Sequence, residues 1–203
     1  PVLLDGVGEA VEEYRKVTNE YCVPFSTAKW TKHNREAYMV GALARLNNNF
    51  DQLHPRAKEA AKKLGLEPLV TNPFLNTAAQ VVEMVHCVED CIRIIDELLT
   101  RGVEPEEPPA VEVKAGEGIG ACEVPRGTLF HHYTYDEEGR CTEANCVIPT
   151  NQNMANLNAD MRALLPQILD RPQEEIRHLL EMLVRAYDPC ISCSAHFLTV
   201  EFV

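Results

Sequence analysis

Residues 116–135, GEGIGACEVPRGTLFHHYTY, decide which kind of fold this chain can adopt. The stretch begins with glycine-rich sequence. Its second half, from Thr128 to Tyr135, alternates between two sets of side chains: Thr128, Phe130, His132 and Thr134 in one set, and Leu129, His131, Tyr133 and Tyr135 in the other. Alternation with a period of two is typical of a β-strand whose faces meet different surroundings. Glu138-Gly139, further on, is typical of a hairpin turn between two strands. We therefore predict a small antiparallel β insert at about residues 111–149.

Helical patterns lie on both sides of this insert. Pro55 and Gly65 stand where a helix starts and ends, and Asn72-Pro73 opens a long apolar stripe that runs to Arg101-Gly102. Apolar residues at helical spacing predict helices at about 5–20, 34–49, 55–65, 73–101, 152–169 and 173–187. The predicted fold class is therefore mainly α (α+β): a helix bundle with a small antiparallel β insert.

Composition narrows the possible classes of function. The chain has 203 residues, is 45% hydrophobic and carries a net charge of −12. The hydrophobic content supports a folded core, and the negative charge argues against a nucleic-acid partner, which needs a basic face. No apolar run is long enough for a membrane span and no signal peptide is visible, so we expect a cytoplasmic protein. The chain begins with Pro1 inside an apolar pattern, and we expect it to be processed or cut from a longer one.

The cysteines suggest metal binding or burial rather than a disulfide framework, because the chain shows no sign of secretion. Cys87 and Cys91 are spaced to lie on one face of the longest helix, where the surrounding apolar stripe predicts burial. The eight cysteines are Cys22, Cys87, Cys91, Cys122, Cys141, Cys146, Cys190 and Cys193.

Residues 188–196, DPCISCSAH, place three metal-competent side chains close together: Cys190, Cys193 and His196. Soft thiolates select zinc, nickel, copper(I) or iron in clusters. Spacing alone leaves a catalytic metal site and a structural zinc site open, and the zinc site would take a fourth ligand from Cys141 or Cys146. A disulfide between Cys190 and Cys193 is the least favoured alternative in a reducing compartment.

Arg126 stands between Pro125 and Gly127, so its position in the backbone is restricted. Its guanidinium offers five fixed donors and stays charged at any useful pH. The simpler interpretation is a tight turn with a surface arginine. The glycines before it do not open a helix, as a phosphate-binding loop would.

Together these two motifs resemble the large subunit of nickel-iron hydrogenases. The resemblance is carried by DPCxxCxxH at 188–196 and GEGxGxxExPRGxLxH at 116–131, with lesser matches at Val147–Thr150 and Gly41–Arg45. Gln152-Asn153 and the Ala-Tyr pair before Asp188 look more like the soluble, cofactor-coupled group.

The resemblance implies a role for each matching residue. Cys190 would be a terminal nickel ligand, and Cys193 would bridge nickel to an iron that carries cyanide and carbon monoxide ligands. Arg126 would hydrogen-bond a cyanide and stand over the open face of the site, with Pro125 and Asp188 completing this canopy. A further hydrogen bond to a cyanide would come from Pro149-Thr150, and His196 would bind a magnesium or iron ion.

The implied activity is the reversible heterolytic oxidation of dihydrogen. That reaction needs a Lewis acid and a nearby base, which nickel and the Cys190 thiolate can supply. A fixed guanidinium oriented by a carboxylate adds preorganised electrostatics. Electrons would leave through an iron-sulfur small subunit, because this chain has no run of cysteines typical of a cluster.

The sequence departs from the family pattern in two places, and each departure indicates which form of the large subunit this chain represents. The family's N-terminal CxxC is absent, so we expect a C-terminal portion that carries half of the nickel-iron site, needs the missing N-terminal part of the large subunit and is inactive alone. The tail at 197–203 lies beyond the point where a maturation endopeptidase cuts in this family, which suggests a precursor form in which metal could be unloaded.

The expected organisation is a helical part at 1–103, the β insert at 111–149, a helical C-terminal segment at 151–189 and the precursor-like tail. Two other functions stay open: a non-catalytic scaffold subunit related to the large subunit of respiratory complex I, and a zinc-binding interaction domain.

Overall fold

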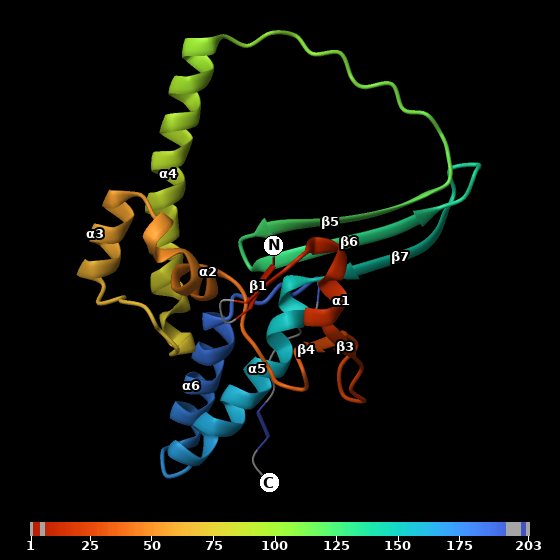
Figure 1. Cartoon of the computed structure of the whole chain (residues 1–203). Helices are drawn as coiled ribbons and strands as arrows, with labels where there is room; N and C mark the ends of the chain where they lie inside the picture. The colour runs from red at the N-terminus through yellow and green to blue at the C-terminus, as the bar shows by residue number, and fades with distance from the viewer. Residues whose placement is uncertain (1, 5–6, 194–199, 202–203) are drawn as a thin grey trace.

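The chain folds as helices around and below a small antiparallel sheet (Figure 1). The computed structural model describes residues 2–4, 7–193 and 200–201. The strands are β1 (Val2–Leu4), β2 (Val7–Glu9), β3 (Asn19–Tyr21), β4 (Trp30–Lys32), β5 (Gly116–Val124), β6 (Gly127–Tyr135) and β7 (Cys141–Val147). The α-helices are α1 (Tyr14–Val17), α2 (Ala42–Asn49), α3 (Pro55–Lys63), α4 (Asn76–Arg101), α5 (Pro149–Leu164) and α6 (Gln173–Ala186). Short 3-10 turns stand at Val11–Glu13, Phe50–Gln52, Pro73–Leu75 and Leu165–Gln167. The mainly α (α+β) class is confirmed.

The predicted β insert is present as a three-stranded antiparallel sheet in the order β5-β6-β7. Gly139 adopts a φ of 75° between β6 and β7, as the predicted hairpin turn requires. One face of the sheet is covered, because Phe130 and Val147 pack with Tyr14 of α1 in a cluster of buried residues. The other face carries Gly118, Gly120 and His131 and is largely exposed.

The first part of the chain differs from the expected helix at 5–20. It forms the antiparallel pair β1–β2, the 3-10 turn, the four-residue helix α1 and then β3, which pairs with β4. Glycine disfavours a helix interior, and Gly8 stands in β2 where the periodicity suggested a helical turn. The helical spacing of Val11, Tyr14 and Val17 survives only over this short segment.

The helix expected at 34–49 begins only at Ala42. The residues before it run along α5, where the side-chain amide of Asn153 holds both backbone groups of Val40. Gly41 then adopts a φ of 111°, which ends the extended segment and opens α2. Tertiary contacts therefore override the local helical pattern at 34–41.

The largest apolar core lies between α2, α3 and α4. Its buried members come from all three helices and the loop after α3: Ala42, Leu43, Leu46, Ala57, Ala61, Leu66, Val70, Ala79 and Val82. Pro55 is the first residue of α3 and Gly65 follows its end with a φ of 69°, as predicted.

Leu46→Ala is expected to destabilise the chain strongly, because Leu46 is only 1% exposed at the centre of this core. Loss of a buried leucine side chain costs about 2–5 kcal/mol through lost burial and the cavity left behind. Urea unfolding would measure this cost. Leu99→Ala is the matched control, since Leu99 is 77% exposed and its truncation should change the free energy by less than about 0.5 kcal/mol. Equal effects of the two variants would contradict this assignment of the core.

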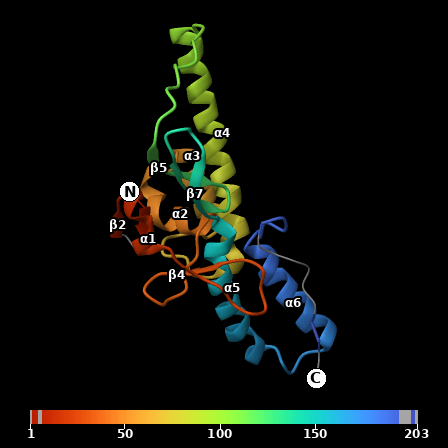
Figure 2. The ribbon, with the colours of Figure 1, turned by 90° about the vertical axis from the view of Figure 1, so that its right-hand side faces the viewer.

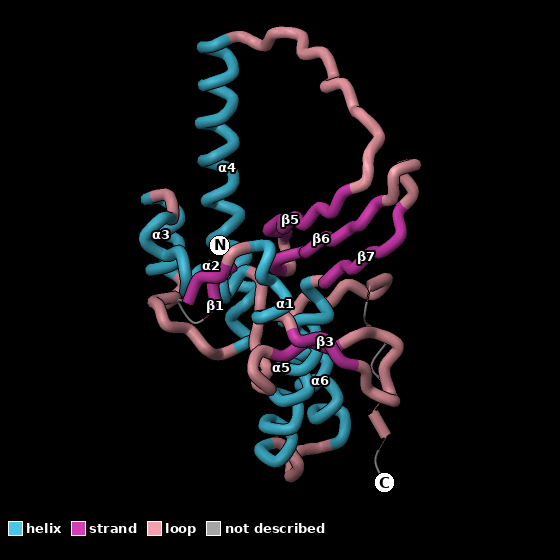
Figure 3. The backbone as a smooth tube through the Cα atoms, turned by 45° about the vertical axis from the view of Figure 1, so that its right-hand side comes forward, coloured by secondary structure: helices cyan, strands magenta, loops and turns pink. Residues whose placement is uncertain are grey.

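Helix α4 is covered over its first turns only (Figure 1). Ala79 and Val82 are buried, whereas the apolar side chains further along are exposed: Val88, Ile92, Ile95 and Leu99. Cys87 and Cys91 are exposed too, so the predicted burial of this pair is wrong for the chain by itself. Residues 102–115 form neither helix nor strand and arch from the end of α4 to β5 (Figure 3).

Helices α5 and α6 form a hairpin at the end of the molecule opposite the free end of α4 (Figure 2). They share two small cores, one around Leu157, Leu183 and Tyr187 and one around Ile168, Ile176 and Leu180. Val200, in the described part of the tail, packs against the second of these. No helix among the described residues is long and apolar enough to cross a membrane.

Candidate functional site

The end of α6 turns the chain towards the sheet. Asp188 follows the helix with a φ of 49°, and its backbone N–H donates to the carbonyl of Arg185 at 2.9 Å. A left-handed residue is a common way to end a helix, and Asp is among the residues that tolerate this conformation. The turn leaves the carbonyl and the carboxylate of Asp188 available to Arg126.

Arg126 and Asp188 are joined in the structure, as the family resemblance implied. The Arg126 Nε donates to the Asp188 carbonyl at 2.6 Å, and one terminal nitrogen lies 3.4 Å from its carboxylate. Both side chains are 40% exposed, so the ion pair contributes at most about 1 kcal/mol to stability. Its main effect is on orientation, because two bonds fix the plane of the guanidinium.

Thr150 connects the start of α5 to the cysteine motif. Pro149 is the first residue of the helix, and Thr150 is 3% exposed. The Thr150 hydroxyl oxygen accepts a hydrogen bond from the backbone N–H of Cys190 at 3.3 Å. Three segments far apart in the sequence, at 125–126, 149–150 and 188–190, thus meet at one place.

The two cysteines of the motif share one turn. The N–H of Cys193 donates to the carbonyl of Cys190 at 3.2 Å, and their Cα atoms lie 5.2 Å apart. The structure joins them in a disulfide, so the expectation against this bond is wrong here. The reason is geometric, because a separation of 5.2 Å lies within the range in which two cysteines can pair.

The same geometry fits two soft ligands of one metal centre. In the reduced form both sulfurs leave one turn side by side, which is the donor chemistry that nickel or zinc accepts. No group of three His, Cys, Asp or Glu residues able to hold a metal occurs in the described part of the chain. Two thiolates are fewer ligands than a nickel or zinc ion takes, so the described residues do not complete such a site by themselves. His196 lies outside the described residues.

A local zinc site gains no support from the two other candidate cysteines. Cys146 hydrogen-bonds to the Tyr133 hydroxyl and to His131, at 3.5 Å in each case. Cys141 bonds to the carbonyl of Glu143 at 3.3 Å. Both belong to β7, and the described residues bring neither of them into a ligand group with Cys190 and Cys193.

Gly127 allows the turn that presents Arg126 to pack closely on the segment before α2. It has a φ of 132°, and a Cβ there would lie 2.4 Å from the Val40 Cγ2. Gly41 makes the reciprocal approach, where a Cβ would lie 3.2 Å from the Arg126 carbonyl oxygen. These contacts explain why the Gly41–Arg45 segment and the Pro-Arg-Gly motif belong to one unit.

Gly127→Ala is expected to destabilise the chain by about 2–5 kcal/mol, through backbone strain and overpacking. Adding Val40→Ala should recover only part of this loss, because it removes the contact with the Val40 Cγ2 but leaves the Val40 Cβ at 2.6 Å and the strain at positive φ. Gly118→Ala is the control, since nothing lies within 4 Å of its added Cβ. Urea unfolding compares the three. A Gly127→Ala variant as stable as Gly118→Ala would show that this close approach is absent.

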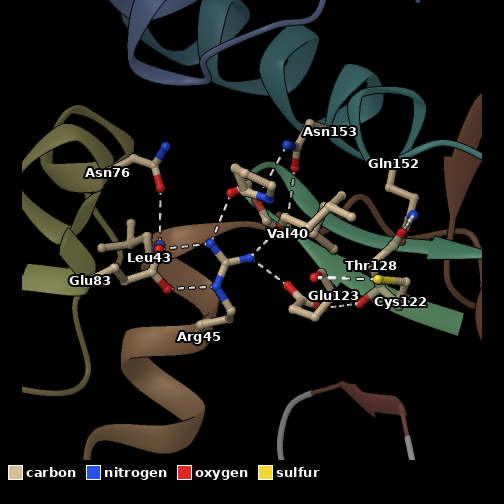
Figure 4. Close-up of polar contacts among 12 residues, drawn as sticks. Val40, Leu43, Arg45, Asn76, Glu83, Cys122, Glu123, Thr128, Gln152 and Asn153 are labelled. Carbon is tan, nitrogen blue, oxygen red and sulfur yellow. Dashed lines mark hydrogen bonds and ion pairs between the residues drawn. The ribbon is translucent and has the colours of Figure 1, made fainter. Parts of the chain in front are cut away.

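Several buried polar residues that support the site are not evident as such from the sequence (Figure 4). Besides Asn153, Gln152 of α5 donates to the carbonyl of Thr128 at 2.6 Å. Asn76 accepts from the N–H of Leu43 at 3.0 Å and donates to the carbonyl of Ala186 at 2.8 Å, which ties α2 and α4 to the end of α6. A buried amide gives no sign of its partner in the sequence.

A profile of the family described as nickel-dependent hydrogenase matches residues 6–196 of this chain. The sulfhydrogenase 1 subunit alpha of Pyrococcus furiosus is 38% identical over 195 residues, which is 95% of this chain and 44% of that protein. The chain therefore belongs to the nickel-dependent hydrogenase family, and the resemblance seen in its motifs is confirmed.

Two further relatives agree with this assignment. The NAD-reducing hydrogenase HoxS subunit beta of Cupriavidus necator is 32% identical over 201 residues, covering 96% of this chain and 40% of that protein. A crystal structure of an NAD+-reducing NiFe hydrogenase in its H2-reduced state is 27% identical, with a TM-score of 0.78 over 96% of this chain and 44% of that one. The chain thus spans less than half the length of these relatives.

Proposed function

We propose that this chain is the C-terminal segment of a hydrogenase large subunit and carries half of a nickel-iron site for reversible oxidation of dihydrogen. The observation that carries the proposal is the meeting of Arg126, Asp188, Thr150 and Cys190 at one place, although they come from three distant segments. The coverage of less than half of each relative supports the view that the other half of the site lies in sequence outside this chain.

Each residue has a role that its contacts support. Reduced Cys190 and Cys193 would hold the metal centre, and the Cys190 thiolate would take up a proton. Arg126, Pro125 and Asp188 would form the canopy, with the guanidinium kept in place by the Asp188 carbonyl. Pro149 and Thr150 would orient the Cys190 backbone and offer a hydrogen bond to a ligand of the iron. When bound, the nickel-iron group would supply the Lewis acidity that splitting dihydrogen requires.

The remaining assignments follow from this role. Electrons would pass to an iron-sulfur small subunit, and the other half of the large subunit would complete the metal ligands. The His196 site for magnesium or iron, the processing of the tail and the soluble, cofactor-coupled subgroup stay predictions. A cytoplasmic location is supported by five exposed free cysteines, Cys22, Cys87, Cys91, Cys122 and Cys141, because exposed thiols persist in reducing compartments.

Metal analysis and infrared spectroscopy of the purified complex that contains this chain test the proposal. We expect nickel and iron together, infrared bands of cyanide and carbon monoxide, and turnover of hydrogen. Zinc alone would favour an interaction domain, and the absence of metal would favour a non-catalytic scaffold. Hydrogen turnover by the 203-residue chain alone would contradict the proposal that it holds only half of the site.

A further inference from the structure

Arg45 of α2 binds the turn that presents Arg126 (Figure 4). Its side chain is 20% exposed and reaches both carboxylate oxygens of Glu83 on α4, at 2.6 and 2.8 Å. A terminal nitrogen also donates to Glu123 at the end of β5. The two remaining bonds go to backbone carbonyls, that of Val124 at 2.9 Å and that of Pro125 at 2.8 Å.

These contacts use the whole hydrogen-bonding capacity of the side chain. An arginine has five N–H donors in a fixed plane, and each of them has a partner here. Burial opposes the charge, but the bonds and charges of Glu83 and Glu123 outweigh it, so the pKa of Arg45 is raised. A lysine could keep the charge, yet its single nitrogen has at most three donors and no planar fork.

The two carbonyls belong to consecutive peptide units, and the second of these joins Pro125 directly to Arg126. Holding both carbonyl oxygens fixes the planes of these two peptides, and hence the direction in which the Arg126 side chain leaves the turn. The far side of the turn is closed by Thr128, whose hydroxyl donates to Glu123 at 2.6 Å. Arg45 is thus bonded to the backbone immediately before a residue that must point at Asp188.

We infer that Arg45 is a positioning residue for the reaction: it holds the Val124–Pro125 backbone so that the Arg126 guanidinium stands over the metal centre. This inference rests on the proposed function, since it concerns how that site works. A merely structural arginine that ties α2 to α4 would need only Glu83. The bonds to Glu123 and to the two carbonyls are what place it at the turn.

Arg45→Lys in the assembled hydrogenase tests this role, because it keeps the charge and loses the fork. We expect unchanged nickel and iron content and unchanged KM for the electron acceptor, with kcat lowered about 10- to 100-fold, the range found when a residue that orients a metal site is changed. The cyanide bands in the infrared spectrum should shift in the same direction as in Arg126→Lys. A purely structural role would lower the melting temperature and leave the bands in place.

Arg56→Lys is the matched control, because Arg56 also pairs with a carboxylate of α4, Glu89, but its side chain is 71% exposed and it does not touch the turn. It should leave kcat and the bands unchanged. If Arg45→Lys does not assemble, Glu123→Gln removes the negative charge opposite the fork and one of the two acceptor oxygens, and it should give a smaller change in the same direction.

Wild-type rate and bands in Arg45→Lys, or in Glu123→Gln where only that variant assembles, would overturn the inference while leaving the proposed function intact. A wild-type complex without nickel or without hydrogen turnover is recognised before any variant is made. It would overturn the proposed function, and the inference with it.

Discussion

Serine in place of Cys190 or Cys193 is expected to remove nickel from the assembled enzyme and to abolish hydrogen turnover. The two sulfurs leave one turn with their Cα atoms 5.2 Å apart, so both face the same centre once reduced. A serine hydroxyl is harder than a thiolate and is not deprotonated at neutral pH, which makes it a poor ligand for a soft metal. No other described His, Cys, Asp or Glu group could take over, because none gathers three such residues.

Nickel and iron content per complex, measured beside hydrogen turnover, checks this result. Cys22→Ser is the matched control, because Cys22 is an exposed free cysteine with no place in the candidate site. It should keep both metals and full activity. Retention of nickel in Cys193→Ser would show that this pair is not part of the metal cage.

Arg126→Lys is expected to lower kcat by about 10²- to 10³-fold, the loss typical when a preorganised donor at a reacting centre is removed. The charge is kept, but a lysine ammonium cannot reproduce the planar pair of bonds that Arg126 makes to the carbonyl and carboxylate of Asp188. Nickel and iron content should stay at the wild-type level, since the arginine is not a ligand.

Steady-state kinetics with hydrogen as substrate measures the effect, and metal analysis separates it from a loading defect. Arg140→Lys serves as the control, because Arg140 lies in the exposed hairpin between β6 and β7 and pairs with Asp136 in a local bond. It should have wild-type kcat. An Arg126→Lys enzyme with wild-type kcat would remove Arg126 from the reaction.

Much of the fold was predictable from local signals. Pro55, Gly65, Pro73 and Gly102 marked helix limits correctly, and the alternation around Phe130 identified the sheet. These signals depend on backbone conformation and on which face of an element is buried, and both can be recognised within a single segment of sequence. The contact of Arg126 with Asp188 was predictable only through the family resemblance, because 62 residues separate them.

The errors have a common physical cause. Residues 34–35 form a turn and Asn153 holds Val40, which prevents the expected helix, and Cys87 is exposed because none of the described residues covers that face of α4. Both outcomes depend on partners distant in sequence or outside the chain. Arg45 shows the same limit: the charged residue is visible in the sequence, but its five acceptor atoms come from α4, from the end of β5 and from the turn that follows it.

Helix α4 links the turn that presents Arg126 to a distant, exposed helix end. It is one continuous helix of 26 residues, about 39 Å long, and near its base Asn76 is tied to α6 and Glu83 to Arg45. A small tilt of α4 imposed at its distant, exposed end would move both of these contacts together. We therefore expect the orientation of Arg126 to depend on what supports the exposed end of α4, several turns away.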